Sequence, residues 1–263
     1  MSDPYNAFVD RDRDAAGSWT VGIKSNIAVK GMPWTAGLGH RRDVGAERDA
    51  AVVARLRAAG AAVLGTLNMH EAALGATTDN PWFGRTHNPH RLGHTPGGSS
   101  GGSGAAVAAG LCDAALGTDT LGSVRIPAAY CGVYGLKPTH GAVDTDGLIF
   151  LGRRYDTIGP LARTPDMLER VWRIIGGADD GSGPPFRRML RLADLAGAGH
   201  PDLARSVAQT RRPDESGAQR RHRRRRLRAV TGARSGAGDR ARPAVRHRRR
   251  DVRLRVRLPG AGP

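Results

Sequence analysis

The sequence Gly-Gly-Ser-Ser-Gly-Gly-Ser-Gly occupies residues 97–104 and is the stretch that decides how this chain folds. A segment rich in glycine and serine is in general a flexible linker between domains. Here, however, Ala-Ala-Val-Ala-Ala follows at once at residues 105–109 and predicts a packed helix. We therefore interpret the stretch as a turn leading into a helix, where glycine lets backbone N–H groups and serine hydroxyls approach a substrate.

The surrounding residues argue against two kinds of nucleotide-binding loop. A phosphate-binding loop ends in Gly-Lys-Ser/Thr, yet no lysine occurs between Lys30 and Lys137. A dinucleotide-binding fingerprint needs an acidic residue suitably placed after a strand, and none stands there. A second glycine-rich element at residues 117–127 supports the substrate turn instead. It places Ser123 beside a glycine, 24 residues after Ser99.

Short apolar runs alternate with amphipathic segments, and this predicts an α/β fold class with a buried sheet. The expected strands are residues 19–23, 27–29, 62–64 (ending at Gly65) and 114–116. The expected helices are residues 47–59, 103–111 and 165–175. The polar, proline-broken stretch 77–96 is expected to be loop.

The net charge of +17 divides the chain into two pieces. Residues 1–186 hold 18 Lys+Arg and 18 Asp+Glu, whereas residues 187–263 hold 23 Arg and 6 acids, so the second piece carries the whole excess. Every Phe, Tyr and Trp lies at or before Phe186. We expect one folded domain over 1–186 and a tail over 187–263 that lacks the apolar periodicity for a core.

The composition of the tail argues against a nucleic-acid partner. It contains no Lys, Asn, Ile, Phe or Tyr, although nucleic-acid tails normally mix lysine with arginine and interleave aromatic side chains. The codons of these missing residues are AT-rich. Our hypothesis is that a GC-rich gene is read out of frame beyond about residue 186, the alternative being a genuine Arg-rich arm. Resequencing the gene distinguishes these two hypotheses, because a frameshift predicts that an alternative reading frame continues the domain.

Three further features bear on the cellular compartment. No run approaches the ~18 consecutive apolar residues that a membrane span needs. The charged residues 10–14 also argue against a secretory signal. Cys112 and Cys131 stand in small, apolar surroundings and are expected to be buried thiols in a reducing compartment. These features predict a cytoplasmic protein without a membrane partner.

Five motifs in order resemble those of the amidase signature family. They are residues 22–27, 65–71, 97–104, 117–127 and 131–139, within a resemblance that runs from about Trp19 to Leu148. The resemblance implies a mixed sheet covered by helices. Since family members are considerably longer, it also implies a scaffold that is incomplete at the C-terminus, where much of the acyl pocket is built.

The resemblance further implies a Ser–Ser–Lys catalytic arrangement. Lys24 falls on the family's lysine, Ser99 on its cis-peptide serine and Ser123 on its nucleophile. A serine hydroxyl needs an adjacent base, and a desolvated lysine can act as one because burial disfavours its charged form. Ser99 would relay the proton. The implied oxyanion hole consists of backbone N–H groups; its donors are Thr120, Leu121, Gly122 and Ser123. Leu121 stands where the family frequently has glycine.

Other polar side chains near these motifs receive weaker interpretations. Asp119 and Arg125 are expected to support the turn rather than to react. Asn68 and Glu71 either brace the site or have no part in it. His87, His90 and His94 share a loop rather than a helix face, so we do not expect a metal site.

The leading functional hypothesis is an amidohydrolase that cleaves a small-molecule carboxamide through an acyl-Ser123 intermediate. Neither a metal nor an organic cofactor is implied. The alternatives are an amidotransferase component that releases ammonia for aminoacyl-tRNA, an inactive fragment that keeps the motifs, and an Arg-rich nucleic-acid binder. A homodimer stays open, and the amide substrate cannot be named from the sequence.

Overall fold

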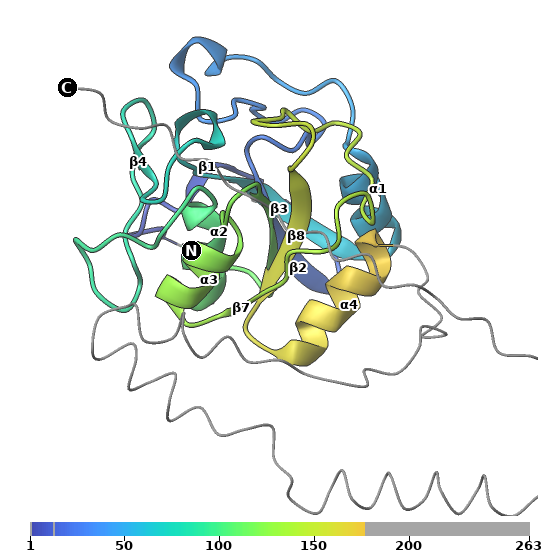
Figure 1. The fold of residues 1–263 in the computed structure, drawn as a ribbon. Helices are drawn as coiled ribbons and strands as arrows, with labels where there is room; N and C mark the ends of the chain where they lie inside the picture. The colour runs from blue at the N-terminus through green and yellow to red at the C-terminus, as the bar shows by residue number, and fades with distance from the viewer. Residues whose placement is uncertain (1, 13, 177–263) are drawn as a thin grey trace, which may run out of the picture. The chain divides into compact units, whose positions relative to one another are not determined.

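A computed structural model describes residues 2–12 and 14–176 (Figure 1). The boundary expected near residue 186 and the Arg-rich stretch 187–263 lie outside these described residues. Across 2–12 and 14–176, no helix is long and apolar enough to cross a membrane.

In the described part of the chain, six strands form the central sheet in the order β1-β3-β2-β6-β8-β7. Strand β2 runs parallel to β3 and to β6, whereas the remaining neighbours pair antiparallel. The sheet is therefore mixed, as expected. The strands are β1 (Phe8–Arg11), β2 (Trp19–Lys24), β3 (Ala61–Leu67), β6 (Ala114–Asp119), β7 (Tyr134–Gly135) and β8 (Thr157–Ala162).

Two pairs of helices cover the two faces of this sheet (Figure 1). On one face, α1 (Ala51–Ala58) and α4 (Pro165–Ile175) pack on the apolar side chains of β2 and β3. On the other face lie α2 (Gly101–Ala108) and α3 (Arg125–Cys131). Successive strand residues point to opposite faces, and β6 accordingly divides its apolar side chains between the two cores: Ala114 and Leu116 join the α1/α4 core, whereas Ala115 joins the α2/α3 core.

Local sequence explains where α4 begins. The Thr164 hydroxyl accepts a hydrogen bond from the Met167 amide at 3.2 Å, and Pro165 occupies the first turn, where its missing N–H is not needed. Val171 and Ile175 then face the sheet. The observed helix has the predicted bounds.

Several expected bounds need correction. Residues 27–29 form no strand, because the Ile27 amide bonds the Lys24 carbonyl in a turn and only an isolated bridge joins Ile27 to Leu148. The predicted helix 47–59 is shorter, the helix expected at 103–111 begins and ends earlier, and β3 runs past Gly65 through a bulge. The loop expected at 77–96 contains a hairpin of β4 (Asp79–Asn80) and β5 (Gly84–Arg85).

Two short 3-10 helices, η1 (Gly39–Arg41) and η2 (Glu71–Ala73), lie in the remaining connections. The parallel strands β3, β2 and β6 all end at the same edge of the sheet. Ligands of α/β sheets bind beyond this carboxyl edge. Lys24 is the last residue of β2 and Asp119 the last of β6, so the motif residues gather where such a site is expected.

Gly102 lets α2 approach the backbone around this edge. A Cβ at this position would lie 2.4 Å from the Asn68 carbonyl oxygen and 2.5 Å from that of Ala7. Alanine is ordinarily preferred to glycine inside a helix, yet here we expect Gly102→Ala to lower the free energy of unfolding by at least about 2 kcal/mol through overpacking. Urea denaturation measures the change. Gly45→Ala is the control, because its nearest atom would be 3.8 Å away, and equal stability of both variants would contradict the expectation.

Candidate active site

Lys24 is a fully buried amine at the centre of the carboxyl edge. Its Nζ lies 2.7 Å from Ser99 Oγ and 2.8 Å from Thr118 Oγ1, in hydrogen-bond contact with both hydroxyls. Burial lowers the pKa of Lys24 from 10.5 to about 7, and the negative charges of Asp119 and Asp156 oppose this only in part. The neutral amine, which can accept a proton, is therefore accessible near neutral pH.

Ser99 stands in the turn just before α2. The Gly98–Ser99 peptide bond is cis, as the family resemblance implies. Thr78 holds this turn from one side, because its hydroxyl donates to the Gly97 carbonyl at 2.9 Å and accepts from the Gly101 amide at 3.0 Å. The Ser99 carbonyl also accepts from the His70 amide at 3.0 Å. The hydroxyl of Ser99 is thus presented to Lys24 by a tightly bonded turn.

Ser123 lies in the turn between β6 and α3. Its carbonyl accepts a hydrogen bond from the Ser100 amide at 3.2 Å, which joins the two serine-bearing turns. The Ser100 hydroxyl bonds both the amide and the carbonyl of Thr118, at 3.2 Å each, and ties the first turn to β6. Within 2–12 and 14–176, the half-buried Ser123 hydroxyl has no hydrogen-bond partner. The structure therefore brings Lys24 and Ser99 into direct contact and places Ser123 on an adjoining, bonded turn.

The four expected oxyanion donors are not equivalent. The Gly122 amide donates to Asp119 Oδ1 at 2.7 Å and is already engaged. The amides of Thr120, Leu121 and Ser123 donate no hydrogen bond within the described part of the chain. The Leu121 side chain is 88% exposed, so it points away from the packed interior. Three of the four amides stay available to an oxyanion.

Asp119 organises this turn, as expected, through a carboxylate that is fully buried. Besides Gly122, the Val124 amide donates to it at 3.1 Å, and the Arg125 guanidinium donates through Nε at 3.0 Å and Nη2 at 2.9 Å. Burial alone would raise the pKa of Asp119, but the hydrogen bonds from Arg125 and the two amides outweigh it and lower that pKa. The carboxylate is ionised and structural.

The structure distinguishes Asn68 from Glu71, the two residues whose part in the site the sequence leaves open. Asn68 braces the backbone near the site, because its Nδ2 donates to the Gly84 carbonyl at 2.9 Å and its own carbonyl accepts from the Gly102 amide at 3.1 Å. Glu71 instead accepts a hydrogen bond from the Trp82 indole at 2.7 Å at the exposed surface. Neither side chain forms a hydrogen bond with Lys24, Ser99 or Ser123.

Two histidines of the 87–94 loop form hydrogen bonds with backbone groups. The His90 Nε2 lies 2.8 Å from the Cys131 carbonyl oxygen, and His87 Nδ1 accepts from the Gly93 amide at 3.3 Å. Across 2–12 and 14–176, no three His, Cys, Asp or Glu side chains are grouped to hold a metal ion. Cys112 and Cys131 are buried, as expected, and burial raises the pKa of each thiol to about 12.

Thr118 and Asn26 belong to the site although the sequence analysis did not single them out. Thr118 Oγ1 accepts from Lys24 and also from Asn26 Nδ2 at 3.2 Å, while the same amide group donates to the Ile149 carbonyl at 3.2 Å. Both residues stand inside motifs that the family resemblance covers, and Thr118 directly precedes Asp119. Their positions inside these motifs are the sequence feature that could have identified Asn26 and Thr118 as site residues.

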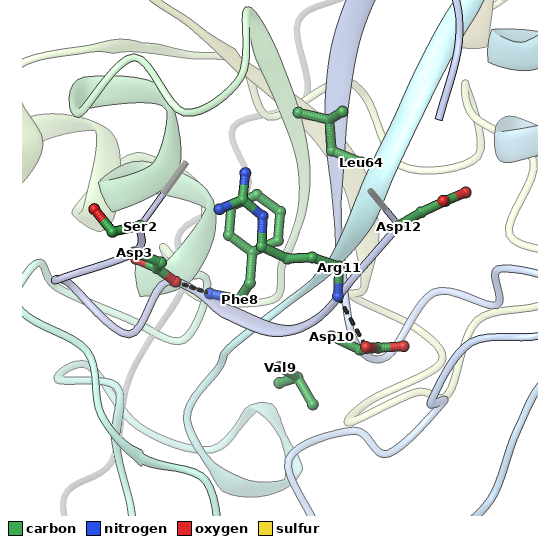
Figure 2. Close-up of a pocket in the computed structure, with 8 residues that line it drawn as sticks. All are labelled: Ser2, Asp3, Phe8, Val9, Asp10, Arg11, Asp12 and Leu64. Carbon is green, nitrogen blue, oxygen red and sulfur yellow. Dashed lines mark hydrogen bonds between the residues drawn. The ribbon is translucent and has the colours of Figure 1, made fainter. Parts of the chain in front are cut away.

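A pocket of about 850 Å³ lies elsewhere, over the edge strand β1 (Figure 2). Figure 2 shows the Arg11 side chain beside the Phe8 ring, with the guanidinium 4.5 Å from the ring centroid. Asp3 accepts hydrogen bonds from the Ala7 and Phe8 amides, both at 2.9 Å. None of the predicted catalytic residues lines this pocket, which is therefore separate from the candidate site.

Comparison with known protein families covers the part of the chain that carries the candidate site residues. The family model described as Amidase matches residues 20–188, well over half of the chain. The chain belongs to the amidase signature family. The match contains all five motifs quoted above.

Among the curated relatives of this amidase-family chain is the A subunit of the glutamyl-tRNA(Gln) amidotransferase of Solidesulfovibrio magneticus. It is 47% identical over 182 residues, which are 69% of this chain and 37% of the relative. The indoleacetamide hydrolase of Pseudomonas syringae pv. syringae is 45% identical over 170 residues, which are 64% of this chain and 38% of that protein. The chain thus spans little more than a third of these relatives.

Solved structures show the same fold. The native peptide amidase from Stenotrophomonas maltophilia superimposes with a TM-score of 0.61 and 35% identity, over 73% of this chain and 45% of that one. The A subunit of the glutamyl-tRNA(Gln) amidotransferase from Thermotoga maritima gives a TM-score of 0.63 at 28% identity, over 86% of this chain and 63% of that one. The expected fold, a mixed sheet covered by helices, is therefore confirmed as that of amidases.

Proposed function

We propose that this chain is an amidohydrolase that cleaves a carboxamide through an acyl-Ser123 intermediate. The observation that carries the proposal is the buried amine of Lys24, 2.7 Å from Ser99 Oγ, with its pKa lowered to about 7. A neutral amine has two N–H donors and one lone pair. It can donate to Thr118 Oγ1 and at the same time accept the Ser99 proton.

The first half of the reaction forms the acyl-enzyme. Ser123 Oγ attacks the amide carbon and gives its proton to Ser99 Oγ, while Ser99 passes its own proton to Lys24 Nζ. The oxygen of the tetrahedral intermediate becomes negatively charged and meets the amides of Thr120, Leu121 and Ser123, which are free to donate. Fixed donors of this kind typically contribute about 3–4 kcal/mol each to transition-state stabilisation.

The second half returns the proton and releases the acid. Lys24 protonates Ser99, and Ser99 protonates the departing nitrogen as the C–N bond breaks. Water then attacks the acyl carbon and gives a proton through Ser99 to Lys24. As the ester bond to Ser123 breaks, Lys24 returns this proton through Ser99 to the Ser123 oxygen, and the free acid leaves and ionises to the carboxylate in solvent. Throughout, the Asp119–Arg125 pair keeps the turn in place.

The names of the relatives support a primary amide as substrate and ammonia as the leaving group. The indoleacetamide hydrolase is 45% identical and the amidotransferase relative is 47% identical, so the two resemblances favour simple amide hydrolysis and glutamine hydrolysis almost equally. The second candidate function is therefore a glutaminase of the amidotransferase type, which would need partner subunits.

Covalent labelling of the full chain tests the proposal. A fluorophosphonate should add once to the folded protein, and peptide mass spectrometry should place the adduct on Ser123. Ammonia release from indole-3-acetamide and from glutamine then separates the two substrates. A folded chain that gains no adduct, or gains it elsewhere, would contradict the proposed function and favour the inactive fragment.

The pH dependence of hydrolysis follows from the base. Protonated Lys24 cannot accept a proton, and its pKa is lowered to about 7. We expect kcat/KM to be low below pH 7, to rise about tenfold per pH unit on the acidic limb, and to level off above about pH 8. Initial rates between about pH 5 and pH 9 measure this profile. A rate that still rises about tenfold per pH unit between about pH 8 and pH 9 would mean that Lys24 titrates as an ordinary solvated lysine.

A further inference from the structure

Asp156 is a buried carboxylate that the proposed mechanism does not use. It directly precedes β8 and is 3% exposed. One oxygen, Oδ2, accepts from the Leu151 amide at 2.7 Å and from the Gly152 amide at 3.0 Å. The other oxygen, Oδ1, accepts from the Thr120 hydroxyl. The carboxylate therefore joins the loop 150–156 to Thr120, the first residue of the turn 120–123, which carries the expected oxyanion donors and is called the oxyanion turn below.

The loop 150–156 is itself folded around this carboxylate. The amides of Tyr155 and Asp156 donate to the Gly152 carbonyl at 2.8 and 2.9 Å. A Cβ built at Gly152 would lie 3.8 Å from Thr120 Cγ2 and 3.7 Å from the Tyr155 ring. The loop thus lies beside Thr120, whose amide is one of the three free oxyanion donors, and the Asp156 carboxylate bonds both the loop and Thr120.

The charge of Asp156 also acts on Lys24. The negative charges of two carboxylates, Asp119 and Asp156, raise the pKa of that amine against the larger effect of burial. Asp119 is paired with the Arg125 guanidinium at 2.9 Å, whereas Asp156 has no cationic partner among the described residues. When Lys24 accepts the Ser99 proton, an ammonium forms in a buried site, and an unpaired negative charge nearby stabilises it.

We propose that Asp156 is a positioning residue, which holds Thr120 at the start of the oxyanion turn and supplies the negative charge that balances the transient Lys24 ammonium. Because it acts through Thr120 and Lys24, this role rests on the proposed amidase function. The two parts of the role are separable by substitution. Asp156→Asn removes the negative charge, whereas Thr120→Val removes only the hydrogen bond between Thr120 and Asp156. Asp156→Glu keeps the charge but lengthens the side chain.

The chain offers a direct readout of Lys24, because it contains only three lysines, Lys24, Lys30 and Lys137. Lysine labelled with ¹³C at Cε gives one NMR signal for each, and Lys24→Met assigns the signal of interest. Asp156→Asn should lower the titration midpoint of Lys24 by about one pH unit, since an opposite charge is lost nearby. Thr120→Val and Asp156→Glu should leave that midpoint in place.

Kinetics supply the second readout. Asp156→Asn and Thr120→Val should both lower kcat by about 10- to 100-fold, with KM nearly unchanged, because an oxyanion donor loses its support. Asp43→Asn removes the same charge at an exposed site and should change neither the midpoint nor the rate. Far-UV circular dichroism and urea denaturation report whether each variant is folded. Thr120→Val removes the hydrogen bond to Asp156 but keeps the charge of the carboxylate.

Failure of this inference is distinguishable from failure of the proposed function. An unchanged Lys24 midpoint in folded Asp156→Asn, or a wild-type kcat in Thr120→Val, overturns the role of Asp156 even if amides are hydrolysed. A wild-type chain without hydrolysis or fluorophosphonate adduct contradicts the proposed function. The titration needs no turnover, so it still tests whether the charge of Asp156 stabilises the Lys24 ammonium. If Asp156→Asn leaves the Lys24 midpoint unchanged in such a chain, the inference is overturned there too.

Discussion

Ser123→Ala is expected to lower kcat for amide hydrolysis by about 10,000-fold or more, because it removes the hydroxyl that is proposed to form the acyl intermediate. Stability should change little. The Ser123 hydroxyl has no hydrogen-bond partner within 2–12 and 14–176, so its removal leaves no buried polar group unpaired. Single-turnover kinetics on a primary amide and urea denaturation measure the two quantities. The variant should also fail to react with the fluorophosphonate.

Ser18→Ala is the matched control for this substitution. Ser18 is an exposed serine before β2, and among the described residues its hydroxyl bonds only the Gly60 carbonyl, at 3.3 Å. We expect wild-type kinetics there. Ser99→Ala should lie between the two, with a decrease of about 100- to 10,000-fold, since it removes the proton relay but keeps the nucleophile. A Ser123→Ala variant that retains the rate of Ser18→Ala would refute the assignment of the nucleophile.

Some elements of the fold were predictable because local chemistry marks them. The helix at 165–175 has a threonine cap, a proline in the first turn and apolar side chains at helical spacing, and it forms with the predicted bounds. Strand β8 escaped prediction because Gly159 and Pro160 interrupt its sequence, and proline is normally excluded from inner strands. It nevertheless lies between β6 and β7, buried along its whole length. Its place is decided by tertiary packing rather than by propensity.

The candidate site likewise contains some features that the sequence predicted and others that depend on tertiary packing. The family resemblance pointed to Lys24 and Ser99, and the structure places their side chains in contact. It did not point to Asp156, which lies 36 residues beyond Thr120 and meets it only after β8 has paired with β6. The engagement of the Gly122 amide by Asp119 was also unforeseen, because it depends on the path of the turn. Contacts made by long-range pairing leave no local pattern to detect.

Lys24→Met is expected to abolish hydrolysis and, independently, to change how stability depends on pH. The pKa of Lys24 falls from 10.5 in the unfolded chain to about 7 in the folded one. Between these values the unfolded state binds more protons, so the free energy of unfolding of the wild type must rise with pH across this window. The contribution of one such group approaches about 1.4 kcal/mol per pH unit. Methionine has a similar length and no proton to bind, so the variant should lack this rise.

The comparison of slopes isolates the lysine, because every other titrating group is shared by both proteins. Between about pH 7 and pH 9, the stability gap between the variant and the wild type should move by about 2 kcal/mol in favour of the wild type. Its absolute size at one pH is less informative, since Lys24→Met also leaves the Ser99 hydroxyl without its partner. Lys30→Met, at an exposed lysine, should reproduce the wild-type slope. If Lys24→Met does so too, the buried amine is not the group that loses its proton near neutrality, and the base must be sought elsewhere.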